Sequence, residues 1–188
     1  ERPVQLLLDL LARDSLYVSG PPGSGKSTFC RRVAWLACEG SMPDSQIAEP
    51  EKYVEQFPSA FSGRLPLLVR LREFWSHLPI TPDCREMTPA ELEAVLVRWV
   101  DGKQPGGLSG AAVQSHLAHG SLLLLLDGFD EVPLTHGDDR KPCQIRAMLL
   151  AGLTASLKAW TGRGNRVLLT SRPYGISDGD ARRLPLRS

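Results

Sequence analysis

The octapeptide G-P-P-G-S-G-K-S, Gly20 to Ser27, is the most informative part of this sequence for predicting the fold. It matches the pattern G-x-x-x-x-G-K-[ST], in which the backbone N–H groups of a glycine-rich loop surround a phosphate. Before it, Leu16 to Ser19 is predicted to form a short buried strand, and after it apolar residues from Phe29 to Ala37 follow helical spacing. Because a phosphate-binding loop needs a strand before it and a helix after it, the context supports the match.

The loop is expected to bind phosphate through its backbone and through two side chains. Lys26 should reach the β- and γ-phosphate oxygens, and the Ser27 hydroxyl should ligate Mg²⁺. The alternative is a glycine-rich turn with a solvated lysine and no binding role. A chance match to this pattern in a chain of this length has a probability on the order of one per cent. The expected binding residues are Gly20, Pro21, Pro22, Gly23, Ser24, Gly25, Lys26, Ser27 and Thr28.

A second motif, L-L-L-L-L-D-G-F-D-E, runs from Leu122 to Glu131. Its leucines predict a strand that is buried on both faces, which is typical of the centre of a parallel sheet. Asp127 would then lie at the carboxyl end of that strand, the edge where open α/β sheets bind their ligands. We therefore expect Asp127 to be the second Mg²⁺-binding residue, acting through the ion's water.

Asp130 and Glu131 follow three and four residues after Asp127. One of them could orient or deprotonate an attacking water, and the spacing favours Glu131 as the base with Asp130 as its orienting partner. In the alternative interpretation the two carboxylates cap the next segment. The sequence leaves both assignments open.

The third motif is R-V-L-L-T-S-R-P-Y-G, Arg166 to Gly175. It predicts a buried strand over Val167–Thr170, with Arg172 just beyond its carboxyl end. A guanidinium there could bridge two oxygens of a γ-phosphate. Arg172 is therefore a candidate sensor of the terminal phosphate.

The remaining pattern predicts strands that alternate with helices, and hence one α/β domain with a parallel sheet covered on both faces. T-P-A-E from Thr88 to Glu91 predicts a helix start with a capping box. Residues 40–64 are expected to be a long connection with one helical turn near Glu51 to Gln56. Further helices are expected near Val4–Arg13, Ala111–Ala118 and Ile145–Trp160, and a strand over Leu65–Leu71.

Composition excludes several classes of protein. With 42% hydrophobic and 23% charged residues the chain has ordinary globular usage, and its net charge of +1 gives no broad basic field for nucleic acid. The longest purely aliphatic run has five residues, far below the roughly 20 of a membrane-spanning helix. Cys30, Cys38, Cys84 and Cys143 show no C-x-x-C pairing, so we expect reduced thiols in a cytoplasmic protein.

Taken in order, four stretches resemble the successive motifs of NACHT-domain NTPases in the STAND group: G-P-P-G-S-G-K-S-T, L-P-L-L-V-R-L-R-E-F, L-L-L-L-L-D-G-F-D-E and L-L-T-S-R-P-Y-G. They cover most of Leu16 to Gly175, and their wording is more like bacterial and fungal members than animal inflammasome receptors. The resemblance implies a three-layer P-loop NTPase core with strand order 5-1-4-3-2, the fifth strand starting at Leu184–Leu186. Residues 1–188 would be the nucleotide-binding domain of a longer protein.

The same resemblance implies a signalling switch of the innate-immune or defence type. Such a domain binds ATP or ADP with Mg²⁺, hydrolyses ATP slowly and controls homo-oligomerisation. Its expected partners are helical and winged-helix domains of its own protein, and Arg172 matches the family's sensor arginine. The residues alone leave rivals open: a working motor ATPase, or a small P-loop kinase. ATP is preferred over GTP on the resemblance only.

Overall fold

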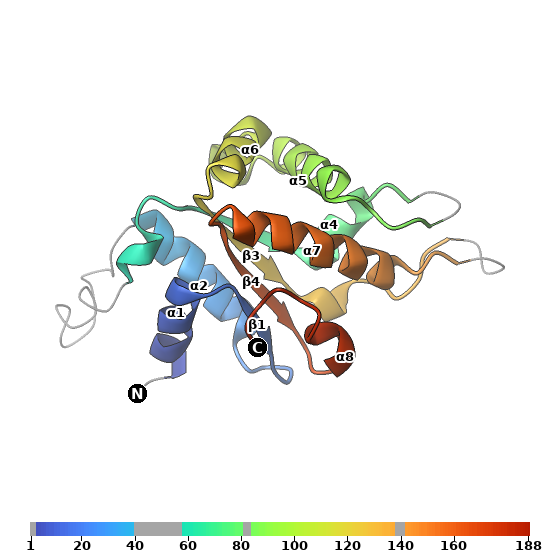
Figure 1. Cartoon of the computed structure of the whole chain (residues 1–188), viewed down its shortest axis with the longest axis horizontal. Helices are drawn as coiled ribbons and strands as arrows, with labels where there is room; N and C mark the ends of the chain where they lie inside the picture. The colour runs from blue at the N-terminus through green and yellow to red at the C-terminus, as the bar shows by residue number, and fades with distance from the viewer. Residues whose placement is uncertain (1–2, 40–57, 81–83, 138–141) are drawn as a thin grey trace.

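The computed structural model describes residues 3–39, 58–80, 84–137 and 142–188. At its centre lie four parallel strands in the order β1-β4-β3-β2, with helices on both faces (Figure 1). Their bounds are Leu16–Ser19 for β1, Leu65–Arg70 for β2, Leu122–Asp127 for β3 and Arg166–Ser171 for β4. The predicted α/β class and parallel sheet are confirmed.

Strand β3 lies inside the sheet, as its leucines predicted. Every residue from Leu122 to Leu126 is buried. Leu122, Leu124 and Leu126 belong to one hydrophobic core, whereas Leu123 and Leu125 belong to the other. Because successive side chains of a strand point to opposite faces, this alternation shows that β3 contributes to the cores on both sides of the sheet.

The core on one face is formed by α1 and α2. Helix α1 spans Pro3–Arg13 and α2 spans Lys26–Glu39. Leu8 and Leu11 of α1 and Val33 and Leu36 of α2 are almost fully buried in this core. Phe61, in the one-turn 3-10 helix η1 at Ser59–Phe61, closes it. The apolar face of α2 therefore fixes the helix that begins at Lys26, within the glycine-rich motif.

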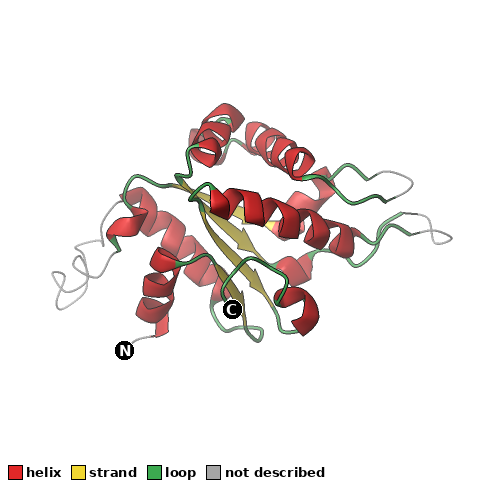
Figure 2. Ribbon diagram, in the orientation of Figure 1, coloured by secondary structure: helices red, strands yellow, loops and turns green. Residues whose placement is uncertain are grey.

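The other face carries α7, with α5 and α6 beside it (Figure 2). Leu149, Leu153, Leu157 and Trp160 are buried residues of α7 in this larger core. The elements concerned are α4 at Leu71–Phe74, η2 at Trp75–His77, α5 at Pro89–Lys103, η3 at Pro105–Gly107, α6 at Gly110–Ala118, η4 at Phe129–Glu131, α7 at Ile145–Gly162 and α8 at Asp178–Ala181.

Helix α5 starts with the predicted capping box. The Glu91 N–H donates to Thr88 Oγ1 at 3.3 Å, and the Thr88 N–H donates to Glu91 Oε2 at 2.9 Å. Arg85 also pairs with the Glu91 carboxylate. Hydrogen bonds from Arg85, and then from Thr88, lower the pKa of Glu91 to about 2.

Two boundaries differ from the sequence prediction. The strand expected to reach Leu71 ends at Arg70, because Leu71 is the first residue of α4. The helical turn expected at Glu51–Gln56, and the connection from residue 40 to 57, lie outside the described residues.

The expected fifth strand at Leu184–Leu186 is wrong, so the sheet differs from the five-stranded order 5-1-4-3-2 by lacking its outer strand. The chain returns beside β1, but contributes an isolated bridge between Leu16 and Arg187. There the Tyr17 N–H donates to the Arg187 carbonyl at 2.8 Å, and the Arg187 N–H to the Ser15 carbonyl at 2.9 Å. Pro185 has no N–H to donate to a ladder, so the pairing does not extend from Arg187 back through Leu184–Leu186.

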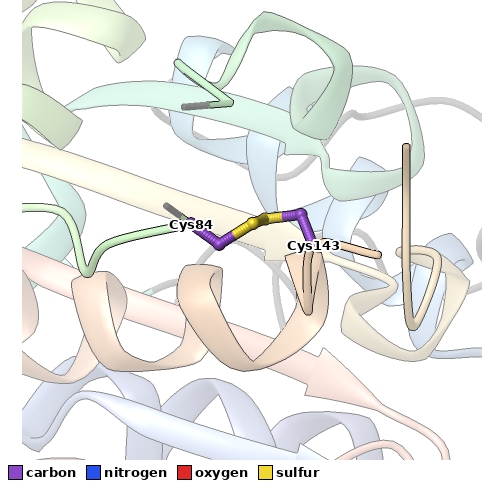
Figure 3. The surroundings of a disulfide bond; sticks show 2 residues. All are labelled: Cys84 and Cys143. Atoms are coloured by element: carbon purple, nitrogen blue, oxygen red, sulfur yellow. A yellow bond between two sulfur atoms is a disulfide. The ribbon is translucent and has the colours of Figure 1, made fainter. Parts of the chain in front are cut away.

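Cys84 and Cys143 form a disulfide, so the expectation of four reduced thiols is wrong for this pair (Figure 3). The bond joins the segment before α5 to the residue just before Gln144 and α7, and the two Cα atoms are 5.4 Å apart. Local spacing did not indicate it because 59 positions separate the two cysteines. Cys30 is buried and Cys38 exposed as free thiols. Burial, followed by the charge of Asp127, raises the pKa of Cys30 well above its usual range.

The parallel register brings the carboxyl ends of the strands to one edge. Arg70 at the end of β2 is opposite Asp127 at the end of β3. Ser19 at the end of β1 is opposite Ser171 at the end of β4. The segments that follow β1, β3 and β4 at this edge belong to the glycine-rich, acidic and arginine-containing motifs of the sequence.

Candidate functional site

The glycine-rich loop connects β1 to α2 and is anchored to β4. The Gly20 N–H donates to the Ser171 carbonyl at 3.2 Å. Gly23 and Gly25 have φ angles of 76° and 85°, in the left-handed region that residues with a Cβ rarely adopt. No atom lies within 4 Å of the Cβ that either glycine lacks, so backbone conformation and not crowding requires glycine here.

Lys26 extends back over this loop. Its Nζ donates to the carbonyl of Gly20 at 2.6 Å, to the carbonyl of Pro21 at 3.0 Å and to Ser24 Oγ at 3.1 Å. The ammonium group is therefore held against the concave side of the loop by its own neighbours. A phosphate oxygen would replace these neutral acceptors with a charged one, which forms the stronger hydrogen bond.

The start of α2 adds a second set of donors. The Phe29 N–H donates to the Gly25 carbonyl at 2.8 Å, and the amides of Lys26, Ser27 and Thr28 precede it in the chain. The first amides of an α-helix have no intrahelical acceptor, and the helix dipole adds partial positive charge at the same end. These groups form an arrangement suited to an anion.

Asp127 is fixed by a contact across the sheet. Thr170 Oγ1 donates to Asp127 Oδ1 at 2.7 Å, and the Gly128 N–H donates to Thr170 Oγ1 at 3.0 Å. Thr170 is almost fully buried, so water does not compete with Asp127 and Gly128 for its hydroxyl. Gly128 has a φ of 78°, a conformation that favours glycine and lets the chain turn into η4 directly after the carboxylate.

Asp130 and Glu131 have different surroundings. Asp130 Oδ1 accepts from the Arg172 N–H at 2.8 Å, and Asp130 Oδ2 lies 3.1 Å from Arg172 Nε. The exposed fraction is 13% for the Asp130 side chain and 38% for Glu131. Glu131 pairs instead with Arg72, at 3.6 Å from Nη1 to Oε2. Asp130 therefore holds the chain after β4, while Glu131 keeps more freedom.

The segment after β4 is packed tightly on η4. A Cβ added at Gly175 would lie 2.0 Å from Ser171 Oγ and 2.8 Å from the Cβ of Asp130, so no other residue fits without a shift. Arg146 of α7 supports the same turn, since its guanidinium donates to the carbonyls of Asp130 at 2.7 Å and Val132 at 2.8 Å. Sequence reasoning missed Arg146, because nothing in its helical pattern marks a partner in η4.

These elements enclose one pocket of about 270 Å³. Most of the predicted residues line it, and Gly20 and Pro21 contribute through their carbonyls on Lys26. Two further residues, Gly128 and Thr170, were not assigned a role from the sequence. The lining residues are Pro22, Gly23, Ser24, Gly25, Lys26, Ser27, Thr28, Asp127, Gly128, Asp130, Glu131, Thr170 and Arg172.

The donor set suits a magnesium phosphate. Ser27 and Asp127 both line the pocket, and a hydroxyl and a carboxylate are oxygen ligands of the kind that Mg²⁺ prefers. Mg²⁺ usually keeps several waters and takes one or two protein oxygens beside phosphate oxygens. Among the described residues there is no cluster of three or more His, Cys, Asp or Glu side chains that would form an all-protein metal cage.

No model of a known protein family matches the sequence, and the search of curated proteins found no relative. None of the helices in the described ranges is long and apolar enough to cross a membrane.

Proposed function

We propose that this chain is the nucleotide-binding core of a P-loop NTPase, which binds ATP or ADP with Mg²⁺ and hydrolyses ATP slowly. One observation carries the proposal: the phosphate loop, Asp127, Glu131 and Arg172 line a single pocket at the carboxyl edge of a parallel sheet. That edge is where open α/β sheets bind their ligands.

Phosphate binding is assigned to the loop and to the start of α2. Lys26 exchanges its contacts with Gly20, Pro21 and Ser24 for β- and γ-phosphate oxygens, and the first amides of α2 donate to the same groups. Ser27 and Asp127 would hold Mg²⁺, which would supply neutralisation of the charge on the phosphates. Thr170 holds the Asp127 carboxylate in place for this role through its hydroxyl.

Hydrolysis is assigned to Glu131 in preference to Asp130. A general base must be able to reach the proton that it accepts. Asp130 accepts from the backbone and side chain of Arg172, whereas the more exposed Glu131 lines the pocket and is held by one ion pair at its edge. In this assignment an attacking water gives its proton to the Glu131 carboxylate, and Asp130 orders the segment that carries Arg172.

Arg172 gives the site a means to distinguish ATP from ADP. Arg172 lines the pocket and its guanidinium pairs with Asp130, so contact with a γ-phosphate requires exchange of that ion pair. On this basis, and on the resemblance to NACHT domains, we propose a switch in which exchange of ADP for ATP changes how the core packs on helical and winged-helix domains of a longer protein and permits homo-oligomerisation.

The test is calorimetry of Mg-ATP, Mg-ADP and Mg-GTP, repeated with EDTA, on the wild-type protein and on Asp127→Asn. The variant is expected to weaken binding more in Mg²⁺ than in EDTA, because the lost charge acts through the ion. Asp9→Asn on α1, which does not line the pocket, is the matched control. Absence of triphosphate binding to the wild type would refute the proposal.

Turnover separates the switch from the working enzymes. A switch shows phosphate release well below the roughly 1–100 s⁻¹ of kinases. Fast multiple turnover would indicate a motor, and transfer of the γ-phosphate to an added acceptor would indicate a kinase.

A further inference from the structure

A second, much smaller cavity lies beside the phosphate pocket. It has a volume of about 30 Å³, and it is lined by Ser27, Arg31, Arg70, Arg72, Asp127 and Glu131. A cavity needs roughly 10–15 Å³ to hold one water, so this space is large enough for a water molecule. Ser27, Asp127 and Glu131 line both cavities, and Glu131 therefore stands at their boundary.

Two arginines of this cavity, Arg70 and Arg72, form ion pairs with nearby glutamates. Arg70 Nη1 lies 3.4 Å from Glu73 Oε1, and Arg72 Nε lies 3.8 Å from the same oxygen. Arg72 Nη1 lies 3.6 Å from Glu131 Oε2. Charges of alternating sign thus run from the end of β2 to η4.

The backbone that carries Arg72 is well anchored. Its neighbours Leu71 and Phe74 in α4 are buried in the larger core, and α4 contacts η4 directly. The exposed fraction of the Arg72 side chain is 52%, so its head group is accessible to solvent while its Cα is fixed. Arg72 can therefore form an ion pair with a flexible side chain such as Glu131 while the backbone of α4 stays in place.

We propose that Arg72 is a positioning residue for ATP hydrolysis, acting through Glu131. A glutamate side chain has several rotatable bonds, and fixing it costs entropy that a partner must offset. Arg72 holds the Glu131 carboxylate at the boundary of the two cavities, where it meets the attacking water. This inference rests on the proposed function, and it names a residue outside the phosphate loop and the acidic motif.

The expected size of the effect follows from the exposure of the pair. Exposed ion pairs contribute about 0.2–1 kcal/mol, which corresponds to a change in rate of roughly 1.4- to fivefold. Arg72→Ala should slow single-turnover hydrolysis of bound ATP within that range, while ATP affinity changes less than the rate. Arg72→Lys, which keeps a cation on a shorter reach, should recover part of the loss.

The decisive experiment is a double-mutant cycle with Arg72→Ala, Glu131→Gln and the two combined. If Arg72 acts through Glu131, Arg72→Ala slows the wild type but causes no further slowing in the Glu131→Gln background. Arg163→Ala is the matched control, because Arg163 has a similar exposed ion pair, 3.3 Å from Glu93, away from both cavities. Thermal melting of each variant checks the fold.

Two results would overturn the role of Arg72 and leave the proposed function standing: an unchanged rate for Arg72→Ala in a protein that hydrolyses ATP, or equal slowing in both backgrounds. A parallel loss of ATP affinity with equal slowing would identify Arg72 as a direct phosphate contact instead. If the wild-type protein binds no Mg-ATP, the proposed function fails, and the role of Arg72 fails with it.

Discussion

Thr170 and Asp127 are joined across two strands: the Thr170 hydroxyl on β4 donates to Oδ1 of Asp127 on β3 at 2.7 Å. The same hydroxyl accepts from the Gly128 N–H at 3.0 Å. One buried oxygen therefore fixes both the rotamer of the proposed magnesium ligand and the turn that follows it.

Replacing Thr170 by valine keeps the shape and removes both hydrogen bonds. The two partners left without this hydroxyl are half-buried, and a hydrogen bond contributes about 0.5–1.5 kcal/mol, or up to about 3 when one partner is charged, so urea unfolding should show a loss of about 1–3 kcal/mol. Affinity for Mg-ATP should fall, while affinity in EDTA changes little. Thr154→Val is the control, because the Thr154 hydroxyl donates within α7 to the Leu150 carbonyl at 2.8 Å. Equal effects of the two substitutions on Mg-ATP affinity would contradict the assigned role.

Lys26→Ala should abolish triphosphate binding and leave the fold intact. Hydrogen bonds to charged groups contribute about 1.5–3 kcal/mol each, so loss of contacts to two phosphates predicts a drop of 100-fold or more. The fold should survive, because the Lys26 ammonium contacts only its own loop among the described residues. Calorimetry and circular dichroism measure the two effects, with Lys158→Ala on the exposed side of α7 as control. Retained ATP affinity would count against the phosphate loop.

Arg172→Ala should weaken ATP binding and leave ADP binding nearly unchanged, because only ATP offers the γ-phosphate. Separate titrations with ATP and ADP test this difference. Arg183→Ala on the exposed C-terminal segment, whose ion pair with Asp180 is 3.7 Å long, is the control. If ATP and ADP lose affinity equally, Arg172 has a structural role through Asp130 and does not sense the terminal phosphate.

The two adjacent carboxylates should respond differently to removal of their charge. Asp130→Asn is expected to lower the free energy of unfolding by about 1–3 kcal/mol, chiefly because it removes the charge that accepts the hydrogen bond of the Arg172 N–H, and also the half-exposed ion pair with the Arg172 guanidinium. Glu131→Gln should leave stability nearly unchanged and slow single-turnover hydrolysis. Denaturant titration and rapid-quench assays on both variants measure the contrast. If Asp130→Asn instead slows hydrolysis and Glu131→Gln lowers stability, Asp130 is the general base.

Reduction of the Cys84–Cys143 disulfide should destabilise the protein. Closing a loop of this length restricts the unfolded chain, and native disulfides typically contribute about 2–4 kcal/mol. Denaturation with and without dithiothreitol should show the difference. A Cys84→Ser, Cys143→Ser double variant should match the reduced protein and respond no further to the reductant. Four titratable thiols in the unfolded, unreduced chain would refute the bond.

Local signals predicted what depends on neighbouring residues. The cap at Thr88, the strand at Leu122–Leu126 and the glycine loop each require only their own stretch of sequence. The prediction of a strand at Leu184–Leu186 was wrong. It rested on the hydrophobic residues and did not take into account that Pro185 has no N–H to donate to a neighbouring strand.

Partners distant in sequence could not be predicted in the same way. The contact of Thr170 with Asp127 depends on β4 lying next to β3, and the disulfide depends on the segment before α5 meeting the segment before α7. The distinction between Asp130 and Glu131 also needs Arg172, which follows a different strand. Sequence alone therefore selected most of the residues that line the pocket, but not the contacts between them.

The disulfide also defines a covalent ring within the chain, from residue 84 to residue 143. Asp127, Asp130 and Glu131 lie inside this ring, whereas Lys26 and Arg172 lie outside it. The acidic residues of the proposed site thus belong to a covalently closed ring. The basic residues belong to the chain segments before residue 84 and after residue 143, which the disulfide does not close. The two parts contact each other non-covalently, through Arg172 with Asp130 and through Thr170 with Asp127. The closed ring and the rest of the chain therefore meet at the pocket.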